Sequence, residues 1–569
     1  MSSASIKQGV NTYAEALHPE HAGDVLQEGE RWATEEDMST LRRVADKIPT
    51  AAYFVVLTEF CERFTYYGIT GPFQNYISNG YQVPNSRPGA IGGGQQMATG
   101  LSNFFQFFCY LCPILGAIIA DQWLGKYKTI LLFSLVYILG NLVLTLTALP
   151  VSIRAGGALP GMVIAMITIG LGTGGIKANV SPMVAEQYSR FRPFVRRLKN
   201  GKEVLVDREL TIQSIFNWFY WAINVGGLSA IATTELEANV DFWAAYLLPT
   251  LMFVFCIVVF WLGRNKYIVS KPTGSIVIKA YRTGRAGLRN YRLAKKENRL
   301  VMNESGKKVS WIDYAKPSLA VDSSFMDWDD RFVDELRTAI RSCKIFLCYP
   351  IFWLCYGQIS NNLISQSGQM NTGSVPNDIM QNIDPLCIII LIPVFDLLIY
   401  PGFRRCGLEL RPVTRITIGF LVAALAMAYA AIIQHLVYTT GPYYTHPAEG
   451  ENGFNHISAG LQVPAYILIA IAEIFASVTG LEYAYKQAPE SMKSIVMSIF
   501  LFTNAGGSIL AFCFNSIAVN PHLVENFAIV SGLMGAFTIL FFVCFRHYDQ
   551  RDADEIMDKT MFEKQANEY

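Results

Sequence analysis

Charge is scarce in this chain. Only 16% of its 569 residues are Asp, Glu, Lys or Arg, whereas 52% are hydrophobic, and the formal net charge is +1. The mean hydropathy of +0.28 is too high for a water-soluble protein of this length. The composition therefore predicts a protein that lies largely within a membrane.

Apolar runs of about 20 residues, the length that crosses a bilayer, fall into two sets of six on either side of a polar stretch. The predicted spans are 51–77, 98–120, 128–150, 159–186, 212–233, 242–263, 342–366, 384–402, 413–434, 461–487, 493–517 and 526–545. The corresponding segments are an N-terminal arm (1–48), a first six-helix bundle (49–263), a central loop with an amphipathic helix (264–341), a second six-helix bundle (342–546) and a C-terminal tail (547–569).

Lys and Arg are unevenly distributed among the loops. The loops on one side of the predicted bundle carry most of them, whereas the loops on the other side carry only Arg87 and Arg154. Because basic loops stay in the cytoplasm, we expect the arm, the central loop and the tail to be cytoplasmic. This orientation predicts a multi-pass protein of the plasma membrane with both termini inside.

Other features that the sequence lacks reduce the number of possible functions. The arm contains no apolar stretch, so we expect no cleavable signal peptide. None of the eleven cysteines lies in a predicted outer loop, which argues against extracellular disulfides. Cys109-x-x-Cys112 is best explained as two small apolar residues in a helix. We find no nucleotide loop, metal cluster or activated nucleophile, so we expect neither an enzyme nor a cofactor.

The polar segments carry helix signals of their own. Thr34 before Glu35-Glu36-Asp37 predicts a short capped helix in the arm. Residues 264–316 are basic, which we interpret as an orientation signal beside anionic lipid. Apolar residues recur at helical spacing within 323–341, with acids between them, and predict an amphipathic helix against the membrane surface or the bundle.

The first span carries three charges that an anchor helix would lack. Glu59, Glu62 and Arg63 would each cost roughly 2.5–3.5 kcal/mol at the centre of a span. On a helix Glu59 and Arg63 lie four residues apart in the favourable acid-first order. Tyr66 and Tyr67 each follow a charged residue by one turn. This stripe must face protein or a water-filled cavity, and it indicates a substrate or proton pathway.

Two more motifs carry charge in the first bundle. Asp121 at the end of the second span is followed by Gly125 and Lys126, which predicts a tight turn whose charges act as a gate; a purely structural turn is the alternative. In the fourth span Lys177 follows a run of small residues that allow close helix approach. This cation needs a partner, either a first-span glutamate or the carboxylate of a substrate.

The second bundle supplies acids where the first supplies cations. Further polar residues in or beside the spans are Asn224, Gln358, Asn362, Asp384, Glu473 and Ser477. Asn224 offers a buried amide that needs partners, and the four-residue spacing places Glu473 and Ser477 on one helical face. A cavity between the bundles would therefore have a positive wall opposite a negative one, which suits a zwitterion. Because each extended residue adds about 3.3–3.6 Å, only short peptides would bridge it.

These motifs resemble a known family. Glu59-x-x-Glu62-Arg63 with Tyr66-Tyr67-Gly68 resembles the ExxER signature of proton-coupled oligopeptide transporters. The segments around Asp121, Lys177 and Asn224 and the segment Gly480-Leu-Glu-Tyr resemble the family's other signatures in the family's order, so the likeness covers roughly residues 50–545. The segments 358–369 and 382–385 are most similar to fungal di- and tripeptide transporters. The resemblance implies an all-α membrane protein of the major facilitator fold, with 12 transmembrane helices in two six-helix halves.

The resemblance also implies roles for individual residues. Proton coupling is assigned to Glu59, Glu62, Arg63 and Lys177, which would exchange salt-bridge partners. Arg63, Lys177, Tyr67 and Tyr110 would hold the peptide carboxylate. Asn224 and Glu473 would hold the amino end, with Ser477 nearby, and Asp384 would strengthen that grip. The complete set of expected substrate-binding residues is Arg63, Tyr66, Tyr67, Tyr110, Lys177, Asn224, Gln358, Asn362, Asp384, Glu473, Ser477 and Phe500. Phe500 would line a side-chain pocket, and Asp121 and Lys126 would form the gate.

The sequence departs from the family pattern at a few positions. Asn103 stands where mammalian relatives have a histidine, so carboxylates must carry proton coupling. Thr70 and Gly357 replace charged residues of many bacterial members, and Ala178 replaces the usual proline after the fourth-span lysine, which affects the expected bend of that helix.

The sequence as a whole predicts a monomeric, proton-driven importer of di- and tripeptides that works by alternating access. Its partners are peptides, protons as the coupling ion and membrane lipid, without nucleic acid or metal. Two alternatives stay open: a transporter of another anion, such as nitrate or a hormone conjugate, and a nutrient receptor that signals through the arm or the central loop. The complete charge stripe of the first span favours peptides.

Overall fold

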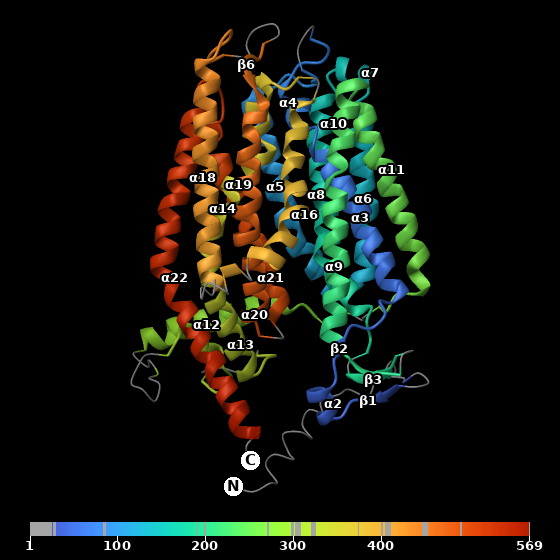
Figure 1. Cartoon of the computed structure of the whole chain (residues 1–569), viewed down its shortest axis with the longest axis vertical. Coiled ribbons are helices and arrows are strands. Elements are labelled where there is room, and N and C mark those ends of the chain that lie inside the picture. Colours follow the sequence, from blue (N-terminus) through green and yellow to red (C-terminus); the bar gives the residue numbers. More distant parts are fainter. Residues whose placement is uncertain are drawn as a thin grey trace.

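The computed structural model describes residues 26, 30–83, 87–190, 192–198, 201–269, 272, 274–297, 301, 309–319, 326–373, 375–399, 402–403, 411–446, 453–489 and 492–567. Long helices run side by side through most of this part, and the short strands lie at its two ends (Figure 1). We call the end with α12 (Ile276–Lys296) and α13 (Asp330–Ser342) the proximal end, and the end with α4 (Phe73–Ser78) and α7 (Pro150–Arg154) the distal end.

The remaining helical elements, in which η marks a short 3-10 or π stretch, divide between two parts of the chain. Those before residue 266 are α2 (Glu35–Thr40), α3 (Thr50–Thr70), α5 (Gly94–Ile119), η1 (Ala120–Leu124), α6 (Lys126–Thr147), α8 (Ala158–Glu186), α9 (Arg208–Gly227), α10 (Ser229–Asn239), α11 (Phe242–Leu262) and η2 (Gly263–Asn265). Those after residue 300 are η3 (Trp311–Ala315), η4 (Cys343–Cys348), α14 (Tyr349–Tyr356), η5 (Gly357–Ser360), α15 (Asn362–Gly368), η6 (Asn377–Asn382), α16 (Ile383–Val394), η7 (Phe395–Ile399), α18 (Pro412–Thr439), η8 (Ala459–Gln462), α19 (Val463–Glu473), η9 (Ile474–Val478), α20 (Thr479–Gln487), α21 (Lys493–Cys513), η11 (Asn515–Ile517) and α22 (Leu523–Asn567).

Ten helical stretches within the described residues are long and apolar enough to cross a membrane, and each coincides with a predicted span. The other two predicted spans, 51–77 and 212–233, coincide with α3 and with the consecutive helices α9 and α10. Helix α3 falls outside the ten, and it carries the three charges of the stripe. The all-helical membrane fold is confirmed, and the count of twelve stays a prediction.

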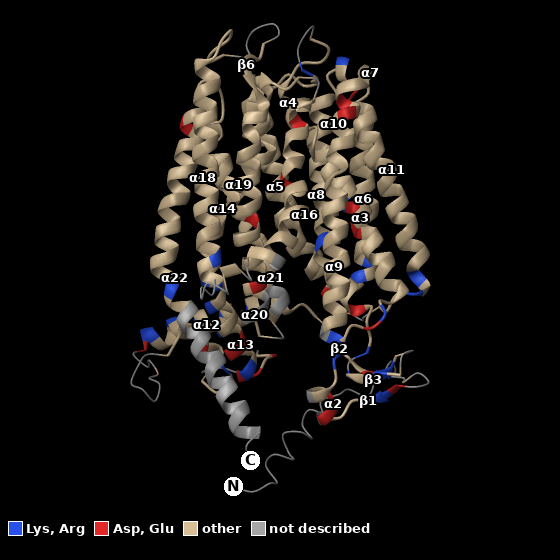
Figure 2. Ribbon diagram, in the orientation of Figure 1, with Lys and Arg blue, Asp and Glu red and all other residues tan. Residues whose placement is uncertain are grey.

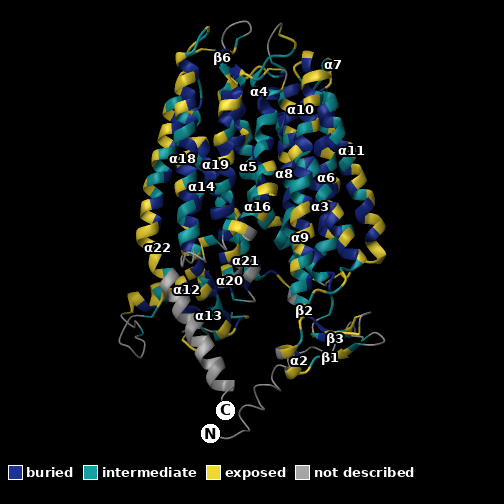
Figure 3. Ribbon diagram, viewed as in Figure 1, coloured by how far each residue is buried: buried dark blue, intermediate teal, exposed yellow. Residues whose placement is uncertain are grey.

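Lys and Arg gather at the proximal end, and few charges lie within the helical body (Figure 2). The outward faces of the helices are exposed (Figure 3), and many of the exposed side chains are large and apolar. Leu139, Ile432 and Ile539 are 58%, 59% and 69% exposed, respectively. Exposed apolar faces on so many helices fit lipid contact, because a protein surrounded by water rarely leaves such an area uncovered.

The buried apolar side chains form two large, separate clusters. One draws on residues between Ala51 and Tyr267, and the other on residues between Ile312 and Phe541. We refer to these parts as the first and second halves. Helix α5 of the first half packs against α21 of the second.

Small residues bring helices of the first half close together, as the sequence predicts. A Cβ added to Gly116 of α5 would lie 2.4 Å from the carbonyl oxygen of Gly174 in α8. Such a contact is far inside van der Waals range, so only glycine lets the two backbones approach this closely. Helix α8 runs without a break through Lys177 and Ala178.

A four-stranded sheet at the proximal end was not anticipated from the sequence. Its order is β1–β3–β4–β2, formed by β1 (Glu30–Trp32), β3 (Phe194–Arg197), β4 (Glu203–Val206) and β2 (Arg43–Val44). The first and last of these strands belong to the arm, and the middle two form a hairpin between α8 and α9. The predicted capped helix is confirmed as α2, where Thr34 and Asp37 form a capping box.

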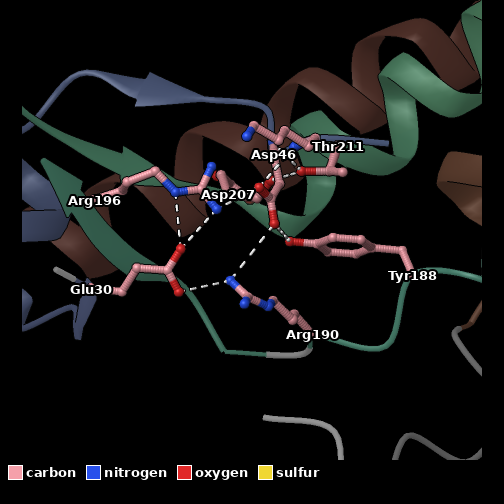
Figure 4. A network of polar contacts seen from close by, with 8 residues as sticks. Glu30, Asp46, Tyr188, Arg190, Arg196, Asp207 and Thr211 are labelled. Carbon is pink, nitrogen blue, oxygen red and sulfur yellow. Dashed lines mark hydrogen bonds and ion pairs between the residues drawn. The ribbon is translucent and has the colours of Figure 1, made fainter. Parts of the chain in front are cut away.

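Ion pairs attach the arm to this hairpin (Figure 4). Arg190 and Arg196 donate to the Glu30 carboxylate over 3.0 and 2.9 Å, and Arg196 also lies 2.7 Å from Asp46. The Tyr188 hydroxyl donates to Asp46 over 3.0 Å. Burial and the Asp46 carboxylate raise the pKa of Tyr188, which keeps this donor protonated. The arm is therefore docked beside the ends of α3, α8 and α9.

The predicted amphipathic helix of the central loop forms as α13, which begins at Asp330 and therefore later than expected. It buries Phe332, Val333 and Leu336 in the cluster of the second half. Phe325, the first apolar residue of the predicted range 323–341, lies outside the described residues.

Candidate functional site

The charge stripe of the first span lies on α3 and is buried. Glu62 is fully buried, and Arg63 and Glu59 are 5% and 6% exposed. The Arg63 Nε atom lies 2.5 Å from Glu62 Oε2 and 3.2 Å from Glu59 Oε1. One arginine thus pairs with two carboxylates. Removing one charge from such a buried group leaves its partner uncompensated, which makes the cluster sensitive to proton binding.

Lys177 contacts an aromatic face. Its Nζ atom lies 3.7 Å from the centroid of the Tyr110 ring, and Arg63 lies 5.1 Å from that of Tyr66. Both are cation–π distances. The ion pairs among the described residues join both first-span glutamates to Arg63 and neither to Lys177. Within the described part of the chain, Lys177 therefore lacks the expected acid partner, which leaves its ammonium group available to a ligand anion.

The acids of the second half meet at one tyrosine. The Tyr356 hydroxyl donates to Asp384 Oδ2 over 3.3 Å and also hydrogen-bonds Glu473. Asp384 Oδ1 and Glu473 Oε2 are buried and have no hydrogen-bond partner among the described residues. Buried carboxylate oxygens without partners are rare, and they suit a protonated amine or a proton. Sequence reasoning missed Tyr356, because a tyrosine inside an aromatic span carries no distinctive signal.

Tyrosines connect the cationic side to the acidic side. Tyr67 interacts electrostatically with Arg63 of its own helix and with Glu473 of the second half, and Tyr110 shows the same pair of interactions. Tyr220 on α9 also interacts with Glu473. The structure therefore brings the predicted cations and acids together across the two halves, with phenols between them.

Two predicted positions differ from expectation. Asn224 is half-buried, and its amide donates to the Tyr220 carbonyl of the same helix over 2.8 Å, so its partner is local. Glu473 ends α19, whereas Ser477 lies in the π-helical turn η9. The predicted shared face assumes 3.6 residues per turn, and the wider π turn breaks that spacing.

The seventh-span amides are buried in hydrogen bonds. Gln358 and Asn362 are 3% and 2% exposed, and the Asn362 amide donates to Gln358 Oε1 over 2.7 Å. Thr99 of the first half donates to Asn362 over 3.4 Å. A peptide would reach these amides only after such bonds open. Phe500 is 2% exposed and packs edge-on against Tyr349, so in this conformation it lies in a packed aromatic cluster.

The predicted gate forms the turn expected of it. Gly125 adopts φ +73°, a conformation that favours glycine, between η1 and α6. Lys126 contacts Glu186 at the end of α8. Asp121 accepts through its carbonyl from the backbone N–H of Gly274 over 3.0 Å. The turn therefore connects α5, α8 and the start of the central loop.

Hydrogen bonds at the distal end tie the two halves together. Arg87 donates to the carbonyls of Gly368 and Met370 over 2.8 and 2.9 Å, and Gln74 donates to Ser365 over 2.8 Å. Arg87 thereby places a cation at the C-terminus of α15, where the helix dipole favours it.

Asn103 also takes part in this junction. It stands at the position of the mammalian histidine, and it accepts a 2.9 Å hydrogen bond from Asn361 of the second half. The described residues contain no group of three or more His, Cys, Asp or Glu side chains that could hold a metal ion.

Comparison with known proteins finds one family. Residues 127–533 match the model of the POT family. The chain is 45% identical to "Probable peptide transporter ptr2" of Schizosaccharomyces pombe, over 92% of this chain and 82% of the relative. It is 42% identical to "Peptide transporter PTR2" of Saccharomyces cerevisiae, over 94% of this chain and 84% of the relative.

Solved structures of the same family share the fold. The POT family transporter PepTSo aligns with a TM-score of 0.69 at 23% identity, over 89% of this chain and 99% of that one. A peptide transporter POT in complex with alafosfalin aligns with a TM-score of 0.61 at 19% identity, over 88% and 95%.

Proposed function

The chain belongs to the POT family, and on that premise we propose that it is a proton-coupled symporter that imports di- and tripeptides by alternating access. One observation supports this proposal above the others. The cations Arg63 and Lys177 belong to one half, and the acids Asp384 and Glu473 belong to the other half and face them. A short peptide has one carboxylate and one ammonium group at a limited separation, and these two walls complement both ends.

We assign the carboxylate end of the peptide to Lys177 and Arg63, with Tyr67 and Tyr110 beside them. Lys177 is the stronger candidate, because its ammonium group contacts a ring, whereas Arg63 is already paired with two glutamates. We assign the amino end to Glu473 and Asp384, because each has a buried oxygen that has no hydrogen-bond partner among the described residues and can accept from the ammonium group.

Proton coupling follows from the α3 cluster. When a proton neutralises Glu59 or Glu62, Arg63 loses one of its two partners and becomes available to the peptide carboxylate. When the proton leaves toward the cytoplasm, the ion pairs re-form and compete with the peptide for Arg63. Proton binding and peptide binding thereby support each other, as linkage requires.

The driving force is adequate. One proton that crosses about 100 mV and about one pH unit supplies roughly 2.3 plus 1.4 kcal/mol. This free energy supports a peptide accumulation of roughly 500-fold.

We further propose that the protein is a monomer in the plasma membrane, surrounded by lipid, with both termini and the proximal end in the cytoplasm. The concentration of Lys and Arg at the proximal end supports this orientation (Figure 2). We expect protons to be the coupling ion and expect no enzymatic activity, cofactor or nucleic-acid partner.

Uptake of labelled di-alanine into proteoliposomes, with and without an inward proton gradient, tests the proposal. We expect gradient-dependent accumulation that excess tripeptide abolishes and that free alanine or nitrate does not affect. Competition by nitrate would favour the other-anion alternative. Absence of uptake by well-folded protein, together with peptide binding in a thermal-shift assay, would favour the receptor alternative.

A further inference from the structure

Two acids with no role in the peptide site meet at the distal junction, the contact formed by Asn75, Glu237, Asn377 and Asp378. Glu237 lies near the end of α10 in the first half, and Asp378 lies in η6 at the start of the eighth span in the second half. Glu237 is 4% exposed and Asp378 is fully buried. The Glu237 and Asp378 carboxyl groups interact with each other across the boundary between the halves.

The other contacts of the junction are made by neutral amides. Asn75 donates to Glu237 Oε1 over 2.9 Å and to Asn377 Oδ1 over 3.0 Å, and Asn377 donates back to Asn75 over 3.1 Å. Both carboxylate oxygens of Asp378 and Oε2 of Glu237 are buried and have no hydrogen-bond donor among the described residues. These oxygens are satisfied when one of the two acids carries a proton and donates it to the other.

A hydrogen bond between the two acids needs a proton, because an ionised carboxylate only accepts hydrogen bonds and one of the two acids must donate. Two buried carboxylates in contact do not both ionise, because like charges at that distance repel strongly in a medium of low dielectric constant. The aspartic-protease dyad is a known example of such sharing.

The surroundings are consistent with one shared proton. The charged and titratable groups that face the pair are Arg87 from the loop before α5, Glu235 from α10 and Tyr246 from α11. With one proton the pair carries a single negative charge, which the Arg87 cation balances. The Tyr246 hydroxyl is buried beside the acids without a hydrogen-bond partner among the described residues, so it offers a further donor.

We propose that Glu237 and Asp378 form a second proton-binding site, separate from the α3 cluster, that holds the distal end closed while it is protonated. Loss of the proton places two negative charges in contact across the boundary, and their repulsion drives the halves apart at this end. Because the closed state binds one more proton than the open state, raising the pH favours the open state. This site rests on the alternating-access part of the proposed function, and acid outside the cell would close the distal end behind a loaded peptide.

The distance between the two halves at the distal end, measured against pH, tests this proposal without any transport. Spin labels would be placed through unnatural amino acids at Val151 of α7 and Thr439 of α18, which are both exposed. The full chain would be studied in lipid nanodiscs by double electron–electron resonance between pH 5 and pH 8, without peptide or gradient. We expect the ratio of long to short distances to rise with pH, by up to about tenfold per pH unit in the transition region.

Asp378→Asn supplies a side-chain amide that donates to Glu237 without a proton. We expect this variant to keep the short distance over the whole pH range, and Glu237→Gln provides a second test if the first variant folds poorly. The matched control is Glu235→Gln, which removes an exposed charge from the same helix. It should keep the pH-dependent change in distance and shift only the midpoint of that change to lower pH, because the Glu235 charge favours protonation of Asp378.

A wild-type distance distribution that does not change with pH would overturn the proposal, and so would an unchanged pH response in both amide variants. Neither result would bear on peptide uptake. Conversely, a failure of di-alanine uptake in proteoliposomes would not affect the distance measurement. Each proposal can therefore be refuted without the other.

Discussion

At the scale of single residues, the candidate site contains two kinds of charged group. Some are already in ion pairs, and others can still bind a ligand or a proton. Arg63 is held by two glutamates, whereas Lys177 contacts a ring and Glu473 has an oxygen without a hydrogen-bond partner in the described part of the chain. Buried charges of this kind occur where binding of a ligand or a proton compensates the charge. Substitution of the paired and the available groups should therefore produce different defects.

Glu62→Gln should uncouple transport from the proton gradient. The glutamine keeps the shape of Glu62 but cannot ionise, so the Arg63 pair can no longer respond to a proton. We expect the accumulation of di-alanine to fall from a ceiling of roughly 500-fold to equilibration, while counterflow exchange persists. Glu203→Gln, which removes an exposed acid of the proximal sheet, is the control. Normal gradient-driven accumulation by Glu62→Gln would contradict the coupling role.

Lys177→Ala should weaken binding of peptides that have a free carboxylate. A hydrogen bond to a charged group contributes about 1.5–3 kcal/mol, so the Kd of Ala-Ala should rise about 10- to 150-fold. The measurement is competition binding with Ala-Ala and with its C-terminal amide. The amide should show little change, and Lys177→Arg should retain part of the preference. An equal loss of affinity for both ligands would show that residues other than Lys177 bind the peptide carboxylate.

At the scale of helices and strands, close packing and short irregular turns place the side chains of the site. Glycine contacts bring α5 against α8, which sets Tyr110 of α5 beside Lys177 of α8. The π turns η1 and η9 end or interrupt two spans at Asp121 and Ser477. Irregular backbone of this kind occurs at functional positions in membrane helices.

Gly116→Ala should destabilise the first half. The added methyl group would lie 2.4 Å from the Gly174 carbonyl oxygen, so the helices would have to separate. Overpacking of this kind costs about 1–3 kcal/mol, which should lower the midpoint of thermal unfolding in detergent. Gly284→Ala on α12 is the matched control, because its methyl group would meet nothing within 4 Å. Equal midpoints for the two variants would rule out the close contact.

At the scale of the whole molecule, the two halves are joined at the distal end by hydrogen bonds from both sides of the boundary. Arg87, Gln74 and Asn75 of the first half all reach second-half partners. These bonds must break whenever the distal end opens, so they contribute to the balance between inward-facing and outward-facing states.

Arg87→Ala should shift that balance toward the state that is open at the distal end. The variant loses hydrogen bonds to Gly368 and Met370 and the cation near Asp378. The same spin-label pair would report a larger fraction of long distances at every pH. Arg154→Ala removes an arginine that bonds Gln82 within the first half, and it should leave the distribution unchanged. An unchanged distribution in Arg87→Ala would show that the junction is held by other contacts.

The sequence by itself determined ten of the spans, the charged stripe of α3, the capped helix α2, the glycine turn at Gly125 and the family. Each of these features is local, because hydrophobic length, helical period and capping chemistry act over a few residues along the chain.

Only the tertiary structure decided which distant residues meet. The Glu237–Asp378 pair, Tyr356 between two acids, the ring beneath Lys177 and the sheet that docks the arm all join segments far apart in the chain. Periodicity predicts which face of a helix is polar, but it contains no information on the helix that packs against that face. The pairing of faces depends on the packing of both halves at once, and that packing is set by shape and by burial of the whole chain.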